Sequence, residues 1–172
     1  IAVSAVLSNA AYGAVTGSSI ASVATLGPMV MPEFRKYRYD MSLATGTLAS
    51  AGTLAVLVPP STLLVIYGVW TETSIGDLFM AGILPCVLLT VAYCGTLALW
   101  CAWRPEVGPP GMRHSWAARM ASLTKLLPAL AVITVVLGGI YGGIMTPSES
   151  AAVGVVGVLG IAIAMRRLRL AA

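Results

Sequence analysis

Charged residues are scarce in this chain. Only 9% of its 172 residues are Asp, Glu, Lys or Arg, against roughly 25% in an ordinary soluble domain. So few charges cannot cover a surface that faces water, and 58% of the residues are hydrophobic. The composition therefore excludes a soluble globular protein and predicts an all-α protein that crosses a membrane several times.

Several kinds of functional sequence are also missing. The chain has no GxxxxGK[ST] phosphate loop, no CxxC or HExxH metal motif and no GxSxG nucleophile motif, so we expect no enzyme. Cys86, Cys94 and Cys101 would be about 10–12 Å apart along a helix, too far for a disulfide or a shared metal. No basic segment with a cleavage site precedes the first apolar stretch, so we do not expect a signal peptide. The first residue is Ile1 and not Met, so we expect a fragment of a longer protein.

The ten basic residues lie in three groups between apolar stretches, within 33–40, 104–125 and 166–169. Basic residues confined to such gaps are typical of cytoplasmic loops, whereas a nucleic-acid surface interleaves them with polar and aromatic residues. The expected crossings are segments 41–70, 75–103, 126–145 and 147–165. With these crossings all three basic groups lie on the cytoplasmic side, and we expect no nucleic-acid partner.

The first apolar segment, 1–31, is too long for one upright crossing. As a single helix it would measure about 46 Å, beyond a hydrocarbon core of about 30 Å. Its centre, 16–19, consists of small and hydroxyl residues that suit a turn. The segment is either a strongly tilted helix or, as we favour, a re-entrant hairpin that turns near Gly17. Spacing leaves open whether 16–19 forms a ligand site or a packing face, since Gly13 and Gly17 form a GxxxG pair.

The second apolar segment, 41–70, is interrupted by Pro59 and Pro60. Neither proline has an N–H group, so the carbonyls of Ala55 and Val56 lose their helical partners. Unpaired carbonyls in hydrocarbon are costly unless a neighbour or a ligand satisfies them. They suit a hard cation such as Na⁺, and the N-terminus of the helix that restarts after the break suits an anion. The alternative is a proline kink stabilised by neighbouring helices.

The rest of the chain divides into a linker and two spans. Residues 104–125 are polar and contain a Pro/Gly cluster, and they form either a solvated connector or a basic helix on the membrane surface. The last span starts at Pro147, with Thr146 as the expected N-cap and Glu149 in the favoured third position of the helix. We therefore expect three regions, 1–103, 104–125 and 126–172.

Six stretches carry a resemblance to a known family: GAVTGSSIASVATLG at 13–27, MPEF at 31–34, YD at 39–40, GTLAVLVPPS at 52–61, YGVWTETSIGDLFMAGILP at 67–85 and GGIYGGIMTPSESAAVG at 138–154. Their order and spacing resemble the large membrane subunit, DctM type, of the tripartite ATP-independent periplasmic (TRAP) transporters. The resemblance implies an elevator-type inverted-repeat transporter with re-entrant hairpins and broken helices. Its first repeat corresponds to 1–103, and its second begins in 126–172.

The resemblance further implies Na⁺-coupled import of organic anions, such as C4-dicarboxylates or sialic acid, across the bacterial inner membrane. The implied partners are a periplasmic solute-binding protein (DctP type), a small membrane subunit (DctQ type) and the lipid bilayer. Na⁺ is the coupling ion, and no other cofactor is expected. Two alternatives stay open: another ion-coupled carboxylate carrier with a related hairpin architecture, and a membrane scaffold subunit that transports nothing.

The resemblance also implies two sets of site residues. In the family a sodium ion lies between the tip of the first hairpin and the helix broken by the double proline. Carried over, this predicts sodium ligands at Thr16, Gly17, Ser18, Ser19, Ala55, Val58 and Pro60. The expected substrate contacts are Ser19, Gly52, Thr53 and Ser61. The family usually has Gly where Ala55 stands, a change that retains the backbone carbonyl.

Overall fold

The computed structural model describes residues 1–109 and 127–164, which form helices and turns without a strand in these ranges. Most of the linker, for which a surface helix and a solvated connector were both open, and the basic residues 166–169 lie outside the described residues. The chain divides into two compact units, 1–112 and 113–172, and each is described by itself.

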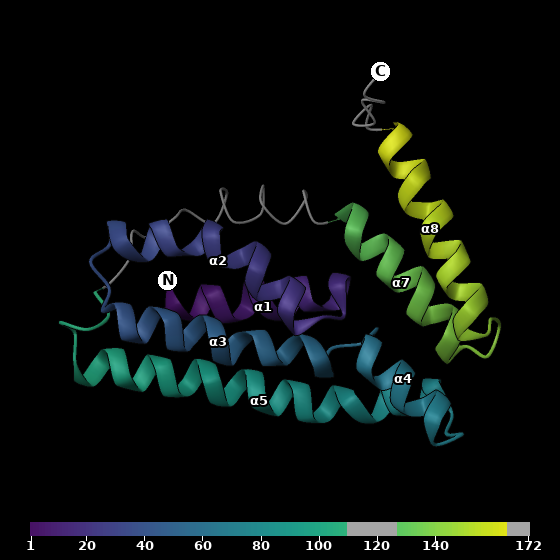
Figure 1. The fold of residues 1–172 in the computed structure, drawn as a ribbon, viewed down its shortest axis with the longest axis horizontal. Helices are drawn as coiled ribbons and strands as arrows, with labels where there is room; N and C mark the ends of the chain where they lie inside the picture. The colour runs from purple at the N-terminus through teal and green to yellow at the C-terminus, as the bar shows by residue number, and fades with distance from the viewer. Residues whose placement is uncertain (110–126, 165–172) are drawn as a thin grey trace. The chain divides into compact units, whose positions relative to one another are not determined.

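Unit 1 is a bundle of helices around a hairpin (Figure 1). Its helices are α1 (Ala2–Thr16), α2 (Ser19–Lys36), α3 (Met41–Leu57), α4 (Thr62–Trp70) and α5 (Ile75–Trp103). Helices α1 and α2 fold back on each other at Gly17, so the alternative of a single tilted helix is excluded. Helix α3 lies beside both halves of the hairpin, and α5 packs on α1 and α3.

Helix α2 extends further than the sequence predicted. The predicted loop over 33–40 is wrong in its first half, because α2 continues to Lys36 in spite of Pro28 and Pro32 within it. The two prolines are four residues apart, so the N–H that Pro32 lacks is the one that would have paired with the Pro28 carbonyl. Basic residues in the last turn favour the helix, since they face its partly negative end.

Small side chains bring α1 and α3 close together. Alanines occupy the buried faces at Ala2 and Ala5 on α1 and at Ala44, Ala51 and Ala55 on α3. Near the end of α1, a Cβ atom added to Gly13 would lie only 2.7 Å from the Cα atom of Ala55. Such close approach of backbones is a usual source of helix association within a membrane.

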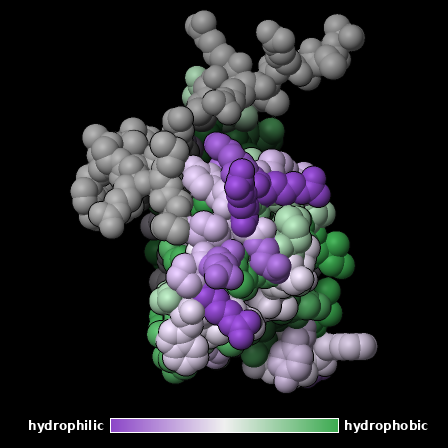
Figure 2. Space-filling model, turned by 90° about the vertical axis from the view of Figure 1, so that its left-hand side faces the viewer, coloured by the Kyte–Doolittle hydropathy of each residue, from purple (hydrophilic) through white to green (hydrophobic). Residues whose placement is uncertain are grey.

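Hydrophilic residues gather at one end of unit 1. The α2–α3 loop and the segment after α5 meet at this end, where the Asp40 N–H donates to the Val107 carbonyl at 3.0 Å. Figure 2 looks onto this end and shows its hydrophilic surface. The basic residues at 35–38 and Arg104 therefore belong to the same end of unit 1.

Unit 2 is a second helical hairpin. Helix α7 (Leu127–Tyr141) packs on α8 (Pro147–Ala164), and Gly143 in the turn between them has a φ of 66°. The predicted capping box is confirmed at the start of α8. The Glu149 N–H donates to Thr146 Oγ1 at 3.3 Å, and Glu149 Oε2 accepts from the Thr146 N–H at 2.8 Å.

The described helices include candidates for membrane spans. Helices α5 and α8 are each long and apolar enough to cross, and α3 with α4 adds a third span if this bent pair counts as one. Large apolar side chains remain exposed on α5, for example Leu84 at 67% and Val91 at 64%. Exposure on this scale is expected for contact with lipid. Within residues 1–109 and 127–164, the prediction of an all-helical membrane protein is confirmed.

Candidate functional site

The tip of the hairpin is built by Gly17 and Ser18. Gly17 has a left-handed backbone with a φ of 58°, and its N–H donates to the Gly13 carbonyl at 2.7 Å, which ends α1. Ser18 has an extended backbone, and its Oγ accepts from the Ala21 N–H at 3.4 Å, which caps α2. The chain therefore reverses direction within two residues.

The break between α3 and α4 covers residues 58–61. The last helical bond of α3 runs from the Val58 N–H to the Leu54 carbonyl at 3.0 Å. The next two carbonyls, those of Ala55 and Val56, would each need an N–H from one of the two prolines, and prolines have none. Helix α4 then continues at an angle of 44° to α3.

The tip lies directly against the break. The Thr62 N–H, the first of α4, donates to the Gly17 carbonyl at 3.3 Å. A Cβ atom added to Gly17 would lie 2.6 Å from the carbonyl oxygen of Pro60. We call this contact between residues 16–19 and residues 58–62 the junction. It places the N-terminus of α4, a partly positive helix end, against the turn of the hairpin.

Further oxygen atoms lie at or near the junction. Ser61 is 1% exposed, and its Oγ has no hydrogen-bond partner among the described residues. Thr16 Oγ1 donates its proton to the Tyr12 carbonyl at 3.2 Å, so its lone pairs remain available. The Ser19 carbonyl would lie 3.7 Å from a Cβ atom added to Gly52. Hydroxyl and carbonyl oxygens of this kind are the ligands that unwound helices offer to Na⁺ in transporters.

The side chains of two predicted site residues point away from the junction, although the carbonyl of Ala55 is one of the two freed by the prolines. Ala55 is fully buried against Gly13, and its methyl group occupies the space that the missing side chain of Gly13 leaves. Thr53 is exposed on another face of α3, where its Oγ1 donates to the Ser50 carbonyl at 2.7 Å and lies 3.4 Å from Tyr93 Oη on α5. Thr53 is therefore not part of the junction.

A polar pair within the hairpin was missed from the sequence. Asn9 and Ser22 are both fully buried, and Ser22 Oγ donates to Asn9 Oδ1 at 2.8 Å. Asn9 is the only asparagine in the chain, which also lacks glutamine. A lone amide inside an uncharged apolar segment is a signal that could have singled out Asn9, though not its partner, because polar groups are costly within a membrane.

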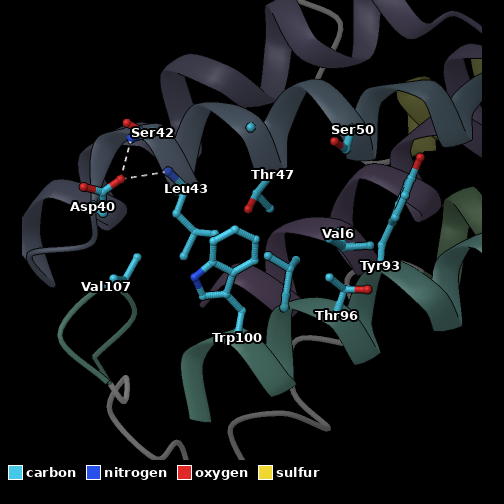
Figure 3. A pocket seen from close by; sticks show the side chains of 12 residues that line it. Val6, Asp40, Ser42, Leu43, Thr47, Ser50, Tyr93, Thr96, Trp100 and Val107 are labelled. Carbon is cyan, nitrogen blue, oxygen red and sulfur yellow. Dashed lines mark hydrogen bonds between the residues drawn. The ribbon is translucent and has the colours of Figure 1, made fainter. Parts of the chain in front are cut away.

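A cavity of about 480 Å³ lies between α3 and α5, apart from the junction (Figure 3). Asp40 lies at one end of the cavity and caps α3, accepting from the N–H groups of Ser42 at 2.8 Å and Leu43 at 3.0 Å. Trp100 and other apolar side chains form much of its wall, and no residue predicted for the sodium or substrate site lines it.

Acidic, histidine and cysteine side chains do not form a metal site in the described ranges, since no three of them lie together.

The chain matches a known family along its whole length. A sequence model of the family described as "Tripartite ATP-independent periplasmic transporter, DctM component" matches residues 1–172.

Individual relatives agree with this match. The chain is 37% identical over 156 residues to the C4-dicarboxylate TRAP transporter large permease protein DctM of Pseudomonas aeruginosa, covering 91% of this chain and 36% of that protein. It is 36% identical over 152 residues to the ectoine/5-hydroxyectoine TRAP transporter large permease protein UehC of Ruegeria pomeroyi, covering 88% and 35%. It is 38% identical over 149 residues to the isethionate TRAP transporter permease protein DctMQ of Oleidesulfovibrio alaskensis, covering 82% and 22%. The chain thus spans little more than a third of the first two relatives, at 36% and 35% of their length.

Proposed function

Because this chain belongs to the DctM component family of the tripartite ATP-independent periplasmic transporters, we propose that it forms part of a Na⁺-coupled permease that imports organic anions. The three relatives are named for C4-dicarboxylates, for ectoine and 5-hydroxyectoine, and for isethionate. Their names differ, so family membership leaves the substrate open. C4-dicarboxylates and sialic acid are the candidates to test first.

The contact between the hairpin tip and the helix break carries this proposal. The bond from the Thr62 N–H to the Gly17 carbonyl draws together the oxygens of the tip, the carbonyls at the break and the N-terminus of α4. Oxygens suit Na⁺, and a helix N-terminus suits a carboxylate. We assign Na⁺ to Thr16, Gly17, Ser18, Ser19, Ala55, Val58 and Pro60. The anion is assigned to Ser19, Gly52 and Ser61. Thr53 is left out of the anion site, because its side chain is exposed on another face of α3.

The dimensions of the hairpin support a re-entrant arrangement. Helix α1 has 15 residues and a length of about 22 Å, which is less than a hydrocarbon core of about 30 Å. Neither α1 nor α2 is among the described helices that qualify as spans. The close packing of α1 on α3 would allow the hairpin and the broken helix to move as one body, as an elevator mechanism requires.

The proposed partners are a small membrane subunit of the DctQ type and a periplasmic solute-binding protein of the DctP type. The name DctMQ of the Oleidesulfovibrio alaskensis relative supports an association between the M and Q components. We place the permease in the bacterial inner membrane, with the basic end of unit 1 in the cytoplasm.

Replacing two tip hydroxyls tests the sodium site. Combined Ser18→Ala and Ser19→Ala in the complete transporter should raise severalfold the Na⁺ concentration for half-maximal uptake, because two proposed ligands are lost. Uptake into proteoliposomes, with the binding protein and a panel of carboxylates, measures this and identifies the substrate. Ser50→Ala is the matched control, since Ser50 is exposed on α3 and does not belong to the junction.

Two results would contradict the proposal. An unchanged Na⁺ dependence in a well-expressed double variant would remove Ser18 and Ser19 from the site. Uptake that proceeds equally well without a Na⁺ gradient would reject sodium coupling altogether.

A further inference from the structure

The hairpin contains a polar pair that the proposed sodium site does not use. Asn9 on α1 and Ser22 on α2 are each 0% exposed and share a hydrogen bond of 2.8 Å. The Nδ2 atom of Asn9 has no partner among the described residues. Burying an amide with an unused donor is costly in apolar surroundings, and an apolar side chain would fill the same space more cheaply.

Both partners are connected to the tip through their own helices, Asn9 by about two turns of α1 and Ser22 by about one turn of α2. Asn9 precedes Gly13 by one turn on the same face of α1, and Gly13 contacts Ala55. On the other side, the Ser22 N–H donates to the carbonyl of Ser18 at 3.0 Å. The bond between Asn9 and Ser22 therefore ties the two helices together one to two turns behind the tip.

We propose that Asn9 is a positioning residue whose bond to Ser22 fixes the spacing of α1 and α2, and thereby sets the Na⁺ affinity of the junction. The inference rests on the proposed function. Asn9 acts through Ser22 and does not touch the ion. Without the bond the two helices are free to slide, and the carbonyl of Gly17 shifts relative to the break. Residues that orient ligands in this way strongly affect ion affinity.

A double-mutant cycle tests this role in the complete transporter. The variants are Asn9→Ala, Ser22→Ala and their combination, and Ser8→Ala is the control because Ser8 is the exposed neighbour of Asn9 on α1. The melting temperature of purified protein, followed over a Na⁺ titration, gives the half-saturating Na⁺ concentration without any transport assay. Ser22→Ala removes only one oxygen, so it tests the bond even if Asn9→Ala does not fold.

We expect each single variant to raise the half-saturating Na⁺ concentration about tenfold. The combined variant should raise the half-saturating Na⁺ concentration no further than a single variant does, because all three variants lose the same bond. Ser8→Ala should have the same half-saturating Na⁺ concentration as the wild type.

The contrary outcomes separate this inference from the proposed function. If Na⁺ does not raise the melting temperature of the wild type, both are rejected. If the wild type responds to Na⁺ and the Ser18→Ala, Ser19→Ala variant loses affinity while Asn9→Ala and Ser22→Ala keep it, only this inference is rejected.

A lower melting temperature with an unchanged half-saturating Na⁺ concentration would indicate that the Asn9–Ser22 pair is purely structural, and this would also reject the inference. Additive effects in the combined variant would also reject it, since Asn9 would then act independently of Ser22.

Discussion

At the scale of single residues, Gly17 satisfies two constraints at once. Its φ of 58° lies in the left-handed region, which side chains other than glycine rarely adopt. A side chain would also collide with the break, since its Cβ atom would lie 2.6 Å from the Pro60 carbonyl oxygen. Any substitution must therefore strain the turn and displace the break together.

Gly17→Ala should abolish Na⁺-dependent uptake. The left-handed conformation alone costs roughly 1–2 kcal/mol for a residue with a side chain, and the displaced Pro60 carbonyl adds to this loss. Uptake and the melting temperature measure the effect. Gly46→Ala is the control, because a Cβ atom there meets nothing within 4 Å and alanine favours a helix. Wild-type uptake by Gly17→Ala would mean that the tip does not dock on the break in this way.

The turn could be predicted from its residues, whereas its supporting pair could not. Gly17 and Ser18 favour a turn and a helix cap by their own conformational preferences, wherever the surrounding helices lie. The role of Asn9 depends on Ser22, which meets it only after the chain has reversed. No local pattern specifies that meeting.

At the scale of helices, α1 and α3 depend on a shared small-residue contact. Ala55 fits beside α1 because Gly13 has no side chain, and a Cβ atom added there would lie 2.8 Å from the Ala55 methyl carbon. This contact explains how the methyl group of Ala55 is accommodated beside α1, where the sequence resemblance led us to expect glycine.

Gly13→Ala should destabilise unit 1 by about 1–3 kcal/mol through overpacking. Adding Ala55→Gly should recover part of that loss, because it removes the methyl group but leaves the Ala55 Cα atom at 2.7 Å from the added carbon. Melting temperatures of the two single variants and the double variant measure this. Gly95→Ala, which meets nothing within 4 Å, is the control. Purely additive effects of the two changes on the melting temperature would show that Gly13 and Ala55 do not interact.

The two interruptions in unit 1 differ in how well the sequence predicted them. The break after α3 follows from the missing N–H groups of two adjacent prolines, which is local chemistry. The end of α2 does not follow from its prolines, because Pro28 and Pro32 lie within a helix that continues to Lys36. A proline removes one bond, and the remaining bonds and the packing of Phe34 in the core decide whether the helix ends.

At the scale of the whole molecule, the order and spacing of motifs were sufficient to identify the family. The junction was expected only through that resemblance, because its central contact joins Gly17 to Thr62, far apart in the sequence. The hydrophilic end of unit 1 also joins distant parts of the chain, the residues before α3 and those after α5. Here the placement of basic residues between apolar stretches was enough to expect the two segments on one side.

The orientation of unit 1 can be tested by labelling single cysteines after replacement of the three native ones. Lys36→Cys at the basic end should react with a membrane-impermeant thiol reagent only in inside-out vesicles, since basic ends favour the cytoplasm. Thr71→Cys, between α4 and α5, should react in intact spheroplasts. The reverse pattern would overturn the proposed orientation.

The tip is held at the break by main-chain atoms, because Gly17 bonds the Thr62 N–H and lies against the Pro60 carbonyl. Docking of this kind does not depend on which side chains flank the glycine. For protein engineering, Thr16, Ser18 and Ser19 are therefore positions to randomise when a carrier for a different ion or solute is sought. Gly17 has to stay unchanged in every member of such a library.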